Sequence, residues 1–229
     1  LRDPAAALRE ARALAAVRHP RVVRLREVDR RGDELYLVLE HAPGGSARQL
    51  LDRQGPLPPA RATRLALDLL EGLDAMHAAG VVHGDVKPEN LLLDADGRGV
   101  LGDFGSATFH GAAEPADATT AGAGAGSLST MSPEALRGAP PAPTRDVYAA
   151  GALLYRLLTG EHHVALERAS AFEARERITL DPPRLPHPRV PARLEPVLRK
   201  ALAKRPAERY PSAREMAAAL ADASAGAGA

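Results

Sequence analysis

The sequence predicts an α+β fold with a small first lobe and a larger, mainly helical second lobe. Apolar residues recur at helical spacing along much of the chain, and short strand-like apolar runs interrupt them. The break Pro43-Gly44-Gly45 separates the first 42 residues from the remainder and marks the expected lobe boundary. A chain of 229 residues can bury the core that two such lobes need.

The first lobe, residues 1–42, is expected to hold one helix and about two strands. Asp3-Pro4 resembles an N-cap followed by the first helical turn, and His19-Pro20 ends the apolar periodicity that follows. Residues 22–25 and 35–39 are strand-like, with a charged turn through Gly32-Asp33 between them.

The second lobe is expected to span residues 43–220. A long helix should follow Pro58-Pro59 and close at Gly80, and the polar, aperiodic run 106–132 should be a functional or disordered loop. The tail 221–229 has the low complexity of a linker or a frayed end. Short strands are predicted at 81–82, 91–93 and 100–101, and further helices at 145–158, 194–202 and 213–220.

Composition excludes several classes of protein. A formal net charge of +1 leaves no electrostatic footprint for nucleic acid or an anionic membrane surface. No run of about 18 apolar residues could span a bilayer, and Leu1-Arg2-Asp3-Pro4 does not begin a signal peptide. The absence of cysteine removes disulfides and thiolate metal sites. We therefore expect a cytoplasmic protein, or the cytoplasmic part of a longer membrane-anchored one, of unspecified oligomeric state.

Two short segments carry the chemistry, namely His83-Gly84-Asp85-Val86-Lys87-Pro88-Glu89-Asn90 and Asp103-Phe104-Gly105. The bias toward Ala, Arg, Gly and Pro indicates a bacterial source with GC-rich codons. Only three lysines and one asparagine occur in the chain, yet Lys87 and Asn90 fall within four residues of each other. Such a window is not expected by chance in this composition.

Phosphoryl transfer requires positioning, charge neutralisation and a group that receives the acceptor's proton. Mg²⁺ prefers oxygen ligands, which Asp and Asn supply together with nucleotide phosphates. Within residues 83–105, the carboxylates of Asp85 and Asp103, the Asn90 amide and the Lys87 ammonium group lie on loops that follow short strands.

The run from Asp85 to Asn90, followed by Asp103-Phe104-Gly105, resembles the catalytic loop and metal-binding segment of eukaryotic-type (Hanks-type) serine/threonine protein kinases. The resemblance covers roughly residues 5–220. It implies a two-lobed protein-kinase-like fold with a truncated N-lobe, use of ATP and Mg²⁺, and a protein substrate whose Ser or Thr hydroxyls are phosphorylated.

The resemblance also implies individual roles. Asp85 would accept or orient the proton of the substrate hydroxyl, and Lys87 would neutralise charge on the phosphate in transfer. Asn90 and Asp103 would hold Mg²⁺. The residues implied to contact ATP or support its site are Glu10 on the regulatory helix, Leu39 guarding the pocket, Glu40 and Ala42 in the hinge, Glu89, and Leu92 beneath the adenine.

Other family features lie further along the chain. Ser132-Pro133-Glu134 stands where the activation segment of the family ends, and Arg209 resembles the partner of Glu134. Asp146 resembles the buried helix aspartate that anchors the catalytic loop. The apolar spine that connects the lobes would comprise Leu14, Leu25, His83 and Phe104.

The sequence departs from the family pattern in two places. Gly84 replaces the arginine that normally pairs with a phosphate on the activation loop, so we expect activity that does not depend on phosphorylation of Thr119 or Thr120. The Gly-rich loop and the strand lysine that would face Glu10 have no counterpart, since no lysine precedes Lys87. We expect both to be encoded upstream of Leu1.

Two other functions use related features. A pseudokinase or scaffold would bind partners without transfer, but such proteins lose residues equivalent to Asp85, Asn90 or Asp103, which are all present. A small-molecule kinase of the aminoglycoside or choline type shares the motif His83-Gly84-Asp85, but generally lacks a counterpart of Lys87 and the Pro-Glu segment. His162-His163 is expected in a surface loop and not at a metal, because no third ligand is evident.

Overall fold

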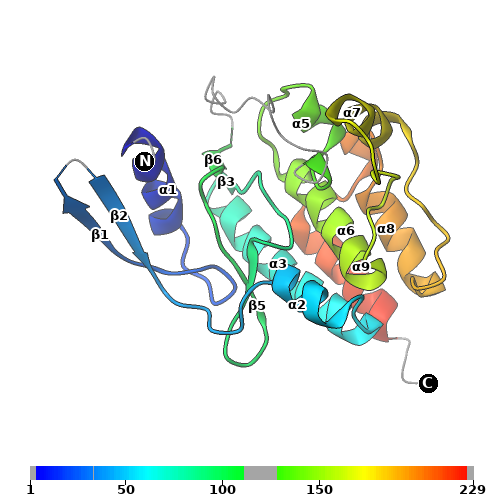
Figure 1. Cartoon of the computed structure of the whole chain (residues 1–229), viewed down its shortest axis with the longest axis horizontal. Helices are drawn as coiled ribbons and strands as arrows, with labels where there is room; N and C mark the ends of the chain where they lie inside the picture. Colours follow the sequence, from blue (N-terminus) through cyan, green and yellow to red (C-terminus); the bar gives the residue numbers. More distant parts are fainter. Residues whose placement is uncertain (1–3, 33, 111–127, 226–229) are drawn as a thin grey trace.

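The computed structural model describes residues 4–32, 34–110 and 128–225. Figure 1 shows a small lobe, made of one helix and a two-stranded hairpin, beside a larger lobe of helices. The α+β class and the small first lobe predicted from the sequence are confirmed. No described helix combines the length and apolar character needed to cross a bilayer.

The small lobe contains α1 (Pro4–Ala16), β1 (Leu25–Arg31) and β2 (Glu34–Leu39). The two strands pair antiparallel, with Val28 opposite Leu37, and α1 packs against β2. On the other face of the hairpin, Val28, Tyr36 and Val38 are 43–44% exposed.

The strand predicted at residues 22–25 is wrong. β1 begins only at Leu25 and continues through the charged residues that follow. Val22 and Val23 are buried and instead join the large lobe, where the Val23 amide donates to the Leu101 carbonyl at 2.9 Å. These two apolar side chains gain more from burial against a large core than from a place in an exposed hairpin.

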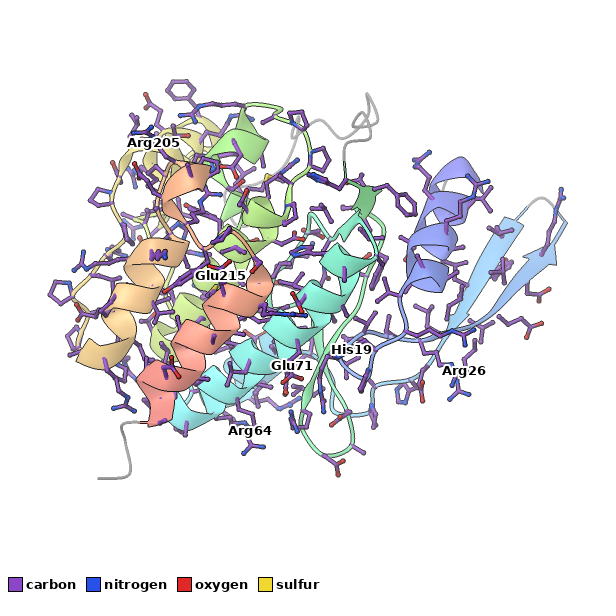
Figure 2. The ribbon with its side chains drawn as sticks, turned by 180° about the vertical axis from the view of Figure 1, so that it is seen from behind. His19, Arg26, Arg64, Glu71, Arg205 and Glu215 are labelled. Atoms are coloured by element: carbon purple, nitrogen blue, oxygen red, sulfur yellow. The ribbon has the colours of Figure 1, made fainter. Side chains whose placement is uncertain are left out.

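The segment between α1 and β1 connects the two lobes. His19 lies within this segment (Figure 2), and the Arg21 guanidinium is 3.8 Å from the carboxylate of Glu71 in the large lobe. The Arg21 carbonyl would lie 2.7 Å from a Cβ placed on Gly72, so the segment approaches helix α3 (Pro59–Ala78) at a position where only glycine leaves room.

The core of the large lobe is built around α3 (Pro59–Ala78) and α6 (Pro143–Thr159), which pack against each other and against α9 (Ala213–Ala225). The predicted apolar face of α3 is confirmed, since Leu65, Leu69, Leu73 and Met76 are at most 1% exposed. Almost every residue of α6 is buried, as expected of a helix in the centre of a lobe. The helix ends at Gly160, whose φ of 76° is the left-handed C-cap conformation.

Three helices were absent from the sequence-based expectation: α2 (Ala47–Gln54), α5 (Pro133–Leu136) and α7 (Ala171–Leu180). The N-termini of α2 and α7 carry capping boxes, formed by Ser46 with Gln49 and by Ser170 with Glu173, which are readable as S-x-x-Q/E signals. Beyond them lie η1 (Ala192–Leu194), α8 (Glu195–Ala201) and η2 (Pro206–Glu208). Helix α9 continues to Ala225, so residues 221–225 are helical where a low-complexity tail was expected.

Two short pairs of antiparallel strands flank the loops of residues 83–90 and 102–107. β3 (Val81–Val82) pairs with β6 (Thr108–Phe109), and β4 (Leu91–Leu93) pairs with β5 (Gly99–Leu101). The buried carboxylate of Asp68 on α3 accepts from the Gly99 amide at 2.8 Å and pairs with Arg98, which attaches β5 to the core. Residues 83–90 and 102–107 are therefore loops held at both ends by paired strands.

Candidate active site

The loop of residues 83–90 lies between β3 and β4. Its backbone turns at Gly84, whose φ is 77°, and a Cβ at that position would lie 3.1 Å from the Ser106 carbonyl oxygen. Glycine accepts this left-handed conformation without the steric cost that other residues incur. The Asn90 amide then donates to the Lys87 carbonyl at 3.0 Å, which closes a turn immediately before β4.

Within this loop, the side chains of Asp85, Lys87 and Asn90 form one hydrogen-bonded cluster. The Lys87 Nζ lies 2.6 Å from Asp85 Oδ2, and Asn90 Nδ2 donates to the same oxygen at 3.0 Å and to the Asp85 carbonyl at 2.8 Å. Asp85 and Lys87 are half-buried, with 24% and 31% of their side chains exposed. The carboxylate is thus fixed in place while remaining accessible to a substrate.

The charge of Lys87 is stabilised within the cluster. Partial burial lowers the pKa of its ammonium group, but the hydrogen bond and charge of Asp85, with further attraction from Asp103 and Glu89, raise the pKa above its ordinary value overall. Lys87 therefore remains a cation at neutral pH and lies within electrostatic reach of Asp103.

Asp103 follows β5 in a backbone conformation that is unusual for a residue with a side chain. Its φ is 57°, and its Oδ1 accepts from the Gly105 amide at 3.2 Å. The residue is exposed, whereas the next one, Phe104, is fully buried. Left-handed non-glycine residues are often associated with functional sites.

Phe104 packs on His83, with ring centroids 5.4 Å apart in an edge-to-face arrangement. His83 is fully buried, and its Nε2 lies 3.1 Å from the Gly102 carbonyl oxygen. Leu14 and Phe104 belong to the same core cluster, and Leu25 packs against it. The four residues predicted to form a spine thus share one core, and His83 is a core residue.

Asp146, at the start of α6, fixes the backbone of the loop of residues 83–90 through hydrogen bonds. Its Oδ2 accepts from the His83 amide at 2.9 Å and lies 2.8 Å from His77 Nε2, while its Oδ1 accepts from the Gly84 amide at 2.9 Å. Burial raises the pKa of this carboxyl, but His77, His83 and the Gly84 amide outweigh burial and lower the pKa overall. The predicted contact between Asp146 and the catalytic loop is confirmed, and His77 is a participant that the sequence did not indicate.

The predicted pair of Glu134 and Arg209 is also present. The guanidinium binds the carboxylate through both Nη atoms, at 2.6 and 2.8 Å, and its side chain is 0% exposed. Arg209 donates as well to the carbonyls of Thr144, Ala203 and Lys204. This single side chain connects the end of the activation segment to α6 and to the turn after α8.

The hinge residues lie beside a cavity of about 560 Å³. Glu40 and Ala42 line it together with residues of the connecting segment and Val100, but Leu39, Leu92 and the residues of the catalytic loop do not. Among the described residues, neither the Glu40 carbonyl nor the Ala42 amide has a backbone hydrogen-bond partner. One acceptor and one donor are therefore available to a ligand at the hinge.

Two other predicted residues lie away from the hinge. Glu10 is buried on α1, at 6% exposure, and is therefore not an ordinary solvated helix residue. Glu89, grouped above with the nucleotide-contacting residues, lies 3.5 Å from the Arg48 guanidinium and lines a different cavity that contains no hinge residue.

The surface loop expected for His162-His163 is wrong as well. His163 is buried and its Nε2 lies 2.8 Å from the Tyr148 hydroxyl, because the segment after α6 folds back onto that helix. No group of three ligating side chains that could hold a metal ion occurs among residues 4–32, 34–110 and 128–225. Thr119 and Thr120 lie outside the described residues.

Comparison with known proteins places these features in a family. The model of the protein kinase domain matches residues 2–219. The serine/threonine-protein kinase PknL of Mycobacterium tuberculosis (strain ATCC 25618 / H37Rv) is 38% identical over 214 residues, which cover 92% of this chain and 52% of PknL. PknB of Mycobacterium leprae is 34% identical over 227 residues, covering 96% of this chain and 36% of that kinase.

A third relative, PknE of Mycobacterium tuberculosis (strain ATCC 25618 / H37Rv), is 33% identical over 211 residues, which cover 92% of this chain and 37% of PknE. The chain thus spans about half the length of these relatives or less. Their mycobacterial source agrees with the bacterial origin that the composition indicated. The loop that carries Asp85, Lys87 and Asn90, together with the match over almost the whole chain, shows that this chain belongs to the protein kinase domain family.

Proposed function

We propose that the protein transfers the γ-phosphate of ATP, with Mg²⁺, to serine and threonine hydroxyls of proteins. The observation that carries this proposal is the Asp85 carboxylate, which is held by Lys87 at 2.6 Å and by Asn90 at 3.0 Å beside Asp103. The names of the relatives support serine or threonine as the acceptor.

In this proposal Asp85 orients the acceptor hydroxyl and receives its proton. The carboxylate is partly exposed, and its hydrogen bonds to Lys87 and Asn90 prevent it from rotating away. A positioned base of this kind typically contributes about 10²–10⁴-fold to the rate. The cationic Lys87 would lie beside the transferred phosphate and neutralise its charge.

The residues present fit Mg²⁺ and ATP. The Asn90 amide nitrogen is used by Asp85, so its oxygen, which accepts no hydrogen bond from a described residue, is available together with the exposed Asp103 carboxylate. Two protein oxygens suit Mg²⁺, which usually completes its six ligands with phosphate and water oxygens. When bound, the ion would neutralise charge on the phosphates.

For the adenine ring of ATP, we propose hydrogen bonds with the backbone carbonyl of Glu40 and the backbone amide of Ala42. The side chains of Leu39 and Leu92 would lie beside the ring. The support for this is that both backbone groups lack a backbone partner among the described residues, and that Leu92 lies on β4, directly after the catalytic loop. Glu10 is proposed to support the phosphate end of the site from α1.

The test uses the full-length protein, ATP labelled in its γ-phosphate, and two acceptor sets: mixed serine and threonine peptides, and small alcohols including aminoglycosides and choline. We expect label in the peptides only. Asp85→Asn should reduce transfer by about 10²–10⁴-fold, whereas Asp96→Asn, the same change on an exposed turn, should leave it unaltered.

The melting temperature tests the proposed binding of Mg²⁺ by Asp103 separately from transfer activity. Mg²⁺ and ATP should together raise the melting temperature of the wild-type protein, and Asp103→Asn should remove the Mg²⁺-dependent part of that increase. Label in small alcohols instead of peptides would favour a small-molecule kinase. Nucleotide-dependent stabilisation without transfer to any acceptor would favour a scaffold.

A further inference from the structure

A second cavity, of about 370 Å³, adjoins the catalytic loop. Its lining includes Lys87 and Glu89 of the catalytic loop, Arg48 of α2 and Arg156 of α6. Thr130 and His162 also line it. Lys87 also bonds Asp85, so the cavity begins where the proposed acceptor hydroxyl would lie. A peptide whose acceptor reaches Asp85 must place its neighbouring residues in or beside this space.

Among the residues of this cavity, Arg156 indicates that an anionic ligand binds there. It is half-buried on α6, and its side chain has no hydrogen bond or ion pair with any residue in the described part of the chain. Burial lowers the pKa of its guanidinium, as does the charge of Arg48, and the nearby carboxylates of Glu89, Asp52 and Glu167 oppose this only in part. Because a guanidinium stays charged in proteins, Arg156 is a partly desolvated cation without a fixed counter-ion.

The other charged groups that line the cavity add to its positive charge. Arg48 Nε bonds both Asp52 oxygens at 3.0 Å, and its Nη1 lies 3.5 Å from Glu89, whose side chain is 47% exposed. Among the described residues that line the cavity, Glu89 thus supplies a single carboxylate beside the three cationic side chains of Arg48, Lys87 and Arg156. Burial lowers the pKa of His162 to about 4 and that of His163 to about 3, so both rings are neutral at pH 7.

We propose that this cavity selects the protein substrate by binding an anionic side chain that lies close in sequence to the acceptor residue. The inference rests on the proposed function and adds a substrate class to it. The planar fork of Arg156 can bind a carboxylate or a phosphate through two hydrogen bonds. An extended peptide advances about 3.3 Å per residue, so residues that flank the acceptor in sequence can enter a cavity that adjoins the catalytic loop.

The experiment measures kcat/KM of the full-length protein for peptides that are identical except around one threonine. The flanking residues are glutamate, glutamine or lysine, and a fourth peptide carries phosphoserine to distinguish a phosphate from a carboxylate ligand. We expect the glutamate peptide to exceed the glutamine peptide by about tenfold, as for one hydrogen bond to a charged group. Raising the salt concentration should reduce this ratio.

Arg156→Gln should reduce the ratio of glutamate to glutamine peptide to near unity, and Arg48→Gln, at an exposed position, should reduce it in part. The matched control is Arg205→Gln, which removes the same charge from a side chain that is 80% exposed and does not line the cavity (Figure 2). The control should keep the wild-type ratio.

The outcomes separate the two proposals. Equal transfer to the glutamate, glutamine and lysine peptides would overturn the substrate preference and leave the kinase activity intact. Transfer to no peptide would overturn the proposed function. Fluorescence anisotropy of the labelled peptides would then test the preference for an anionic peptide by binding alone. Binding of the glutamate peptide that is no tighter than that of the lysine peptide would also overturn the inference.

Discussion

Removing one partner of the buried pair of Glu134 and Arg209 is expected to cost a large share of the stability of the large lobe. In Glu134→Gln, the guanidinium keeps its carbonyl partners but loses its counter-ion, and its side chain is 0% exposed. Removing one partner of a buried pair typically costs about 3–5 kcal/mol because the other charge is left uncompensated. A typical domain has a stability of about 5–15 kcal/mol, so this loss is about a fifth of it or more.

The assay is equilibrium unfolding in urea, followed by far-ultraviolet circular dichroism and repeated as a thermal scan. For a domain of this size, a loss of about 3–5 kcal/mol corresponds to a decrease in Tm of about 6–20 °C. The matched control is Asp74→Asn, which breaks an exposed pair with Arg214 at 2.9 Å, where the Arg214 side chain is 80% exposed. An exposed pair should contribute at most about 1 kcal/mol.

The same pair predicts a pH dependence. Burial alone raises the pKa of Glu134, but Arg209 lowers it below the ordinary value of 4.5 in the folded state. A carboxyl with a lowered folded-state pKa contributes stability above its unfolded pKa and loses it as the pH falls through the folded value. Glu134→Gln should therefore lose less stability than wild type below pH 4.5. If Glu134→Gln loses no more stability at pH 7 than the control Asp74→Asn, the reasoning is refuted.

Asp146→Asn should lower kcat by about 10²-fold, because asparagine keeps only one of the two oxygens that accept from the backbone amides of His83 and Gly84, and the loop would shift; an unchanged kcat for peptide phosphorylation would contradict this. Gly84→Ala should destabilise the protein by about 1–2 kcal/mol, the cost of a left-handed conformation with a Cβ; the urea midpoint measures it, and a higher midpoint would disprove it. The double change Thr119→Ala and Thr120→Ala should leave the transfer rate nearly unaltered, because Gly84 offers no cation to a loop phosphate; a collapse of the rate would show that phosphorylation activates the protein after all.

Local sequence was sufficient to locate the candidate site and most of the elements around it. The strands β3, β4 and β5 are apolar runs between polar loops, and the loop from Asp85 to Asn90 is short enough for its side chains to bond one another. The long helices α3 and α6 show the periodicity or continuous apolar character that burial requires. The pair of Glu134 and Arg209, 75 residues apart in the chain, was expected only from the family resemblance, and the structure contains it.

Contacts between segments far apart in the chain could be decided only by tertiary structure. Nothing in the sequence shows that Val22 and Val23 leave the hairpin for β5, that His77 reaches Asp146, or that His163 is buried against Tyr148. The pattern of a segment reports how much of it is buried, but not what covers it. The sequence by itself thus determined the family, the catalytic loop and most helices of this protein, whereas packing alone brought Arg156 and Arg48 together beside that loop, since electrostatic fields add in space and not along the chain.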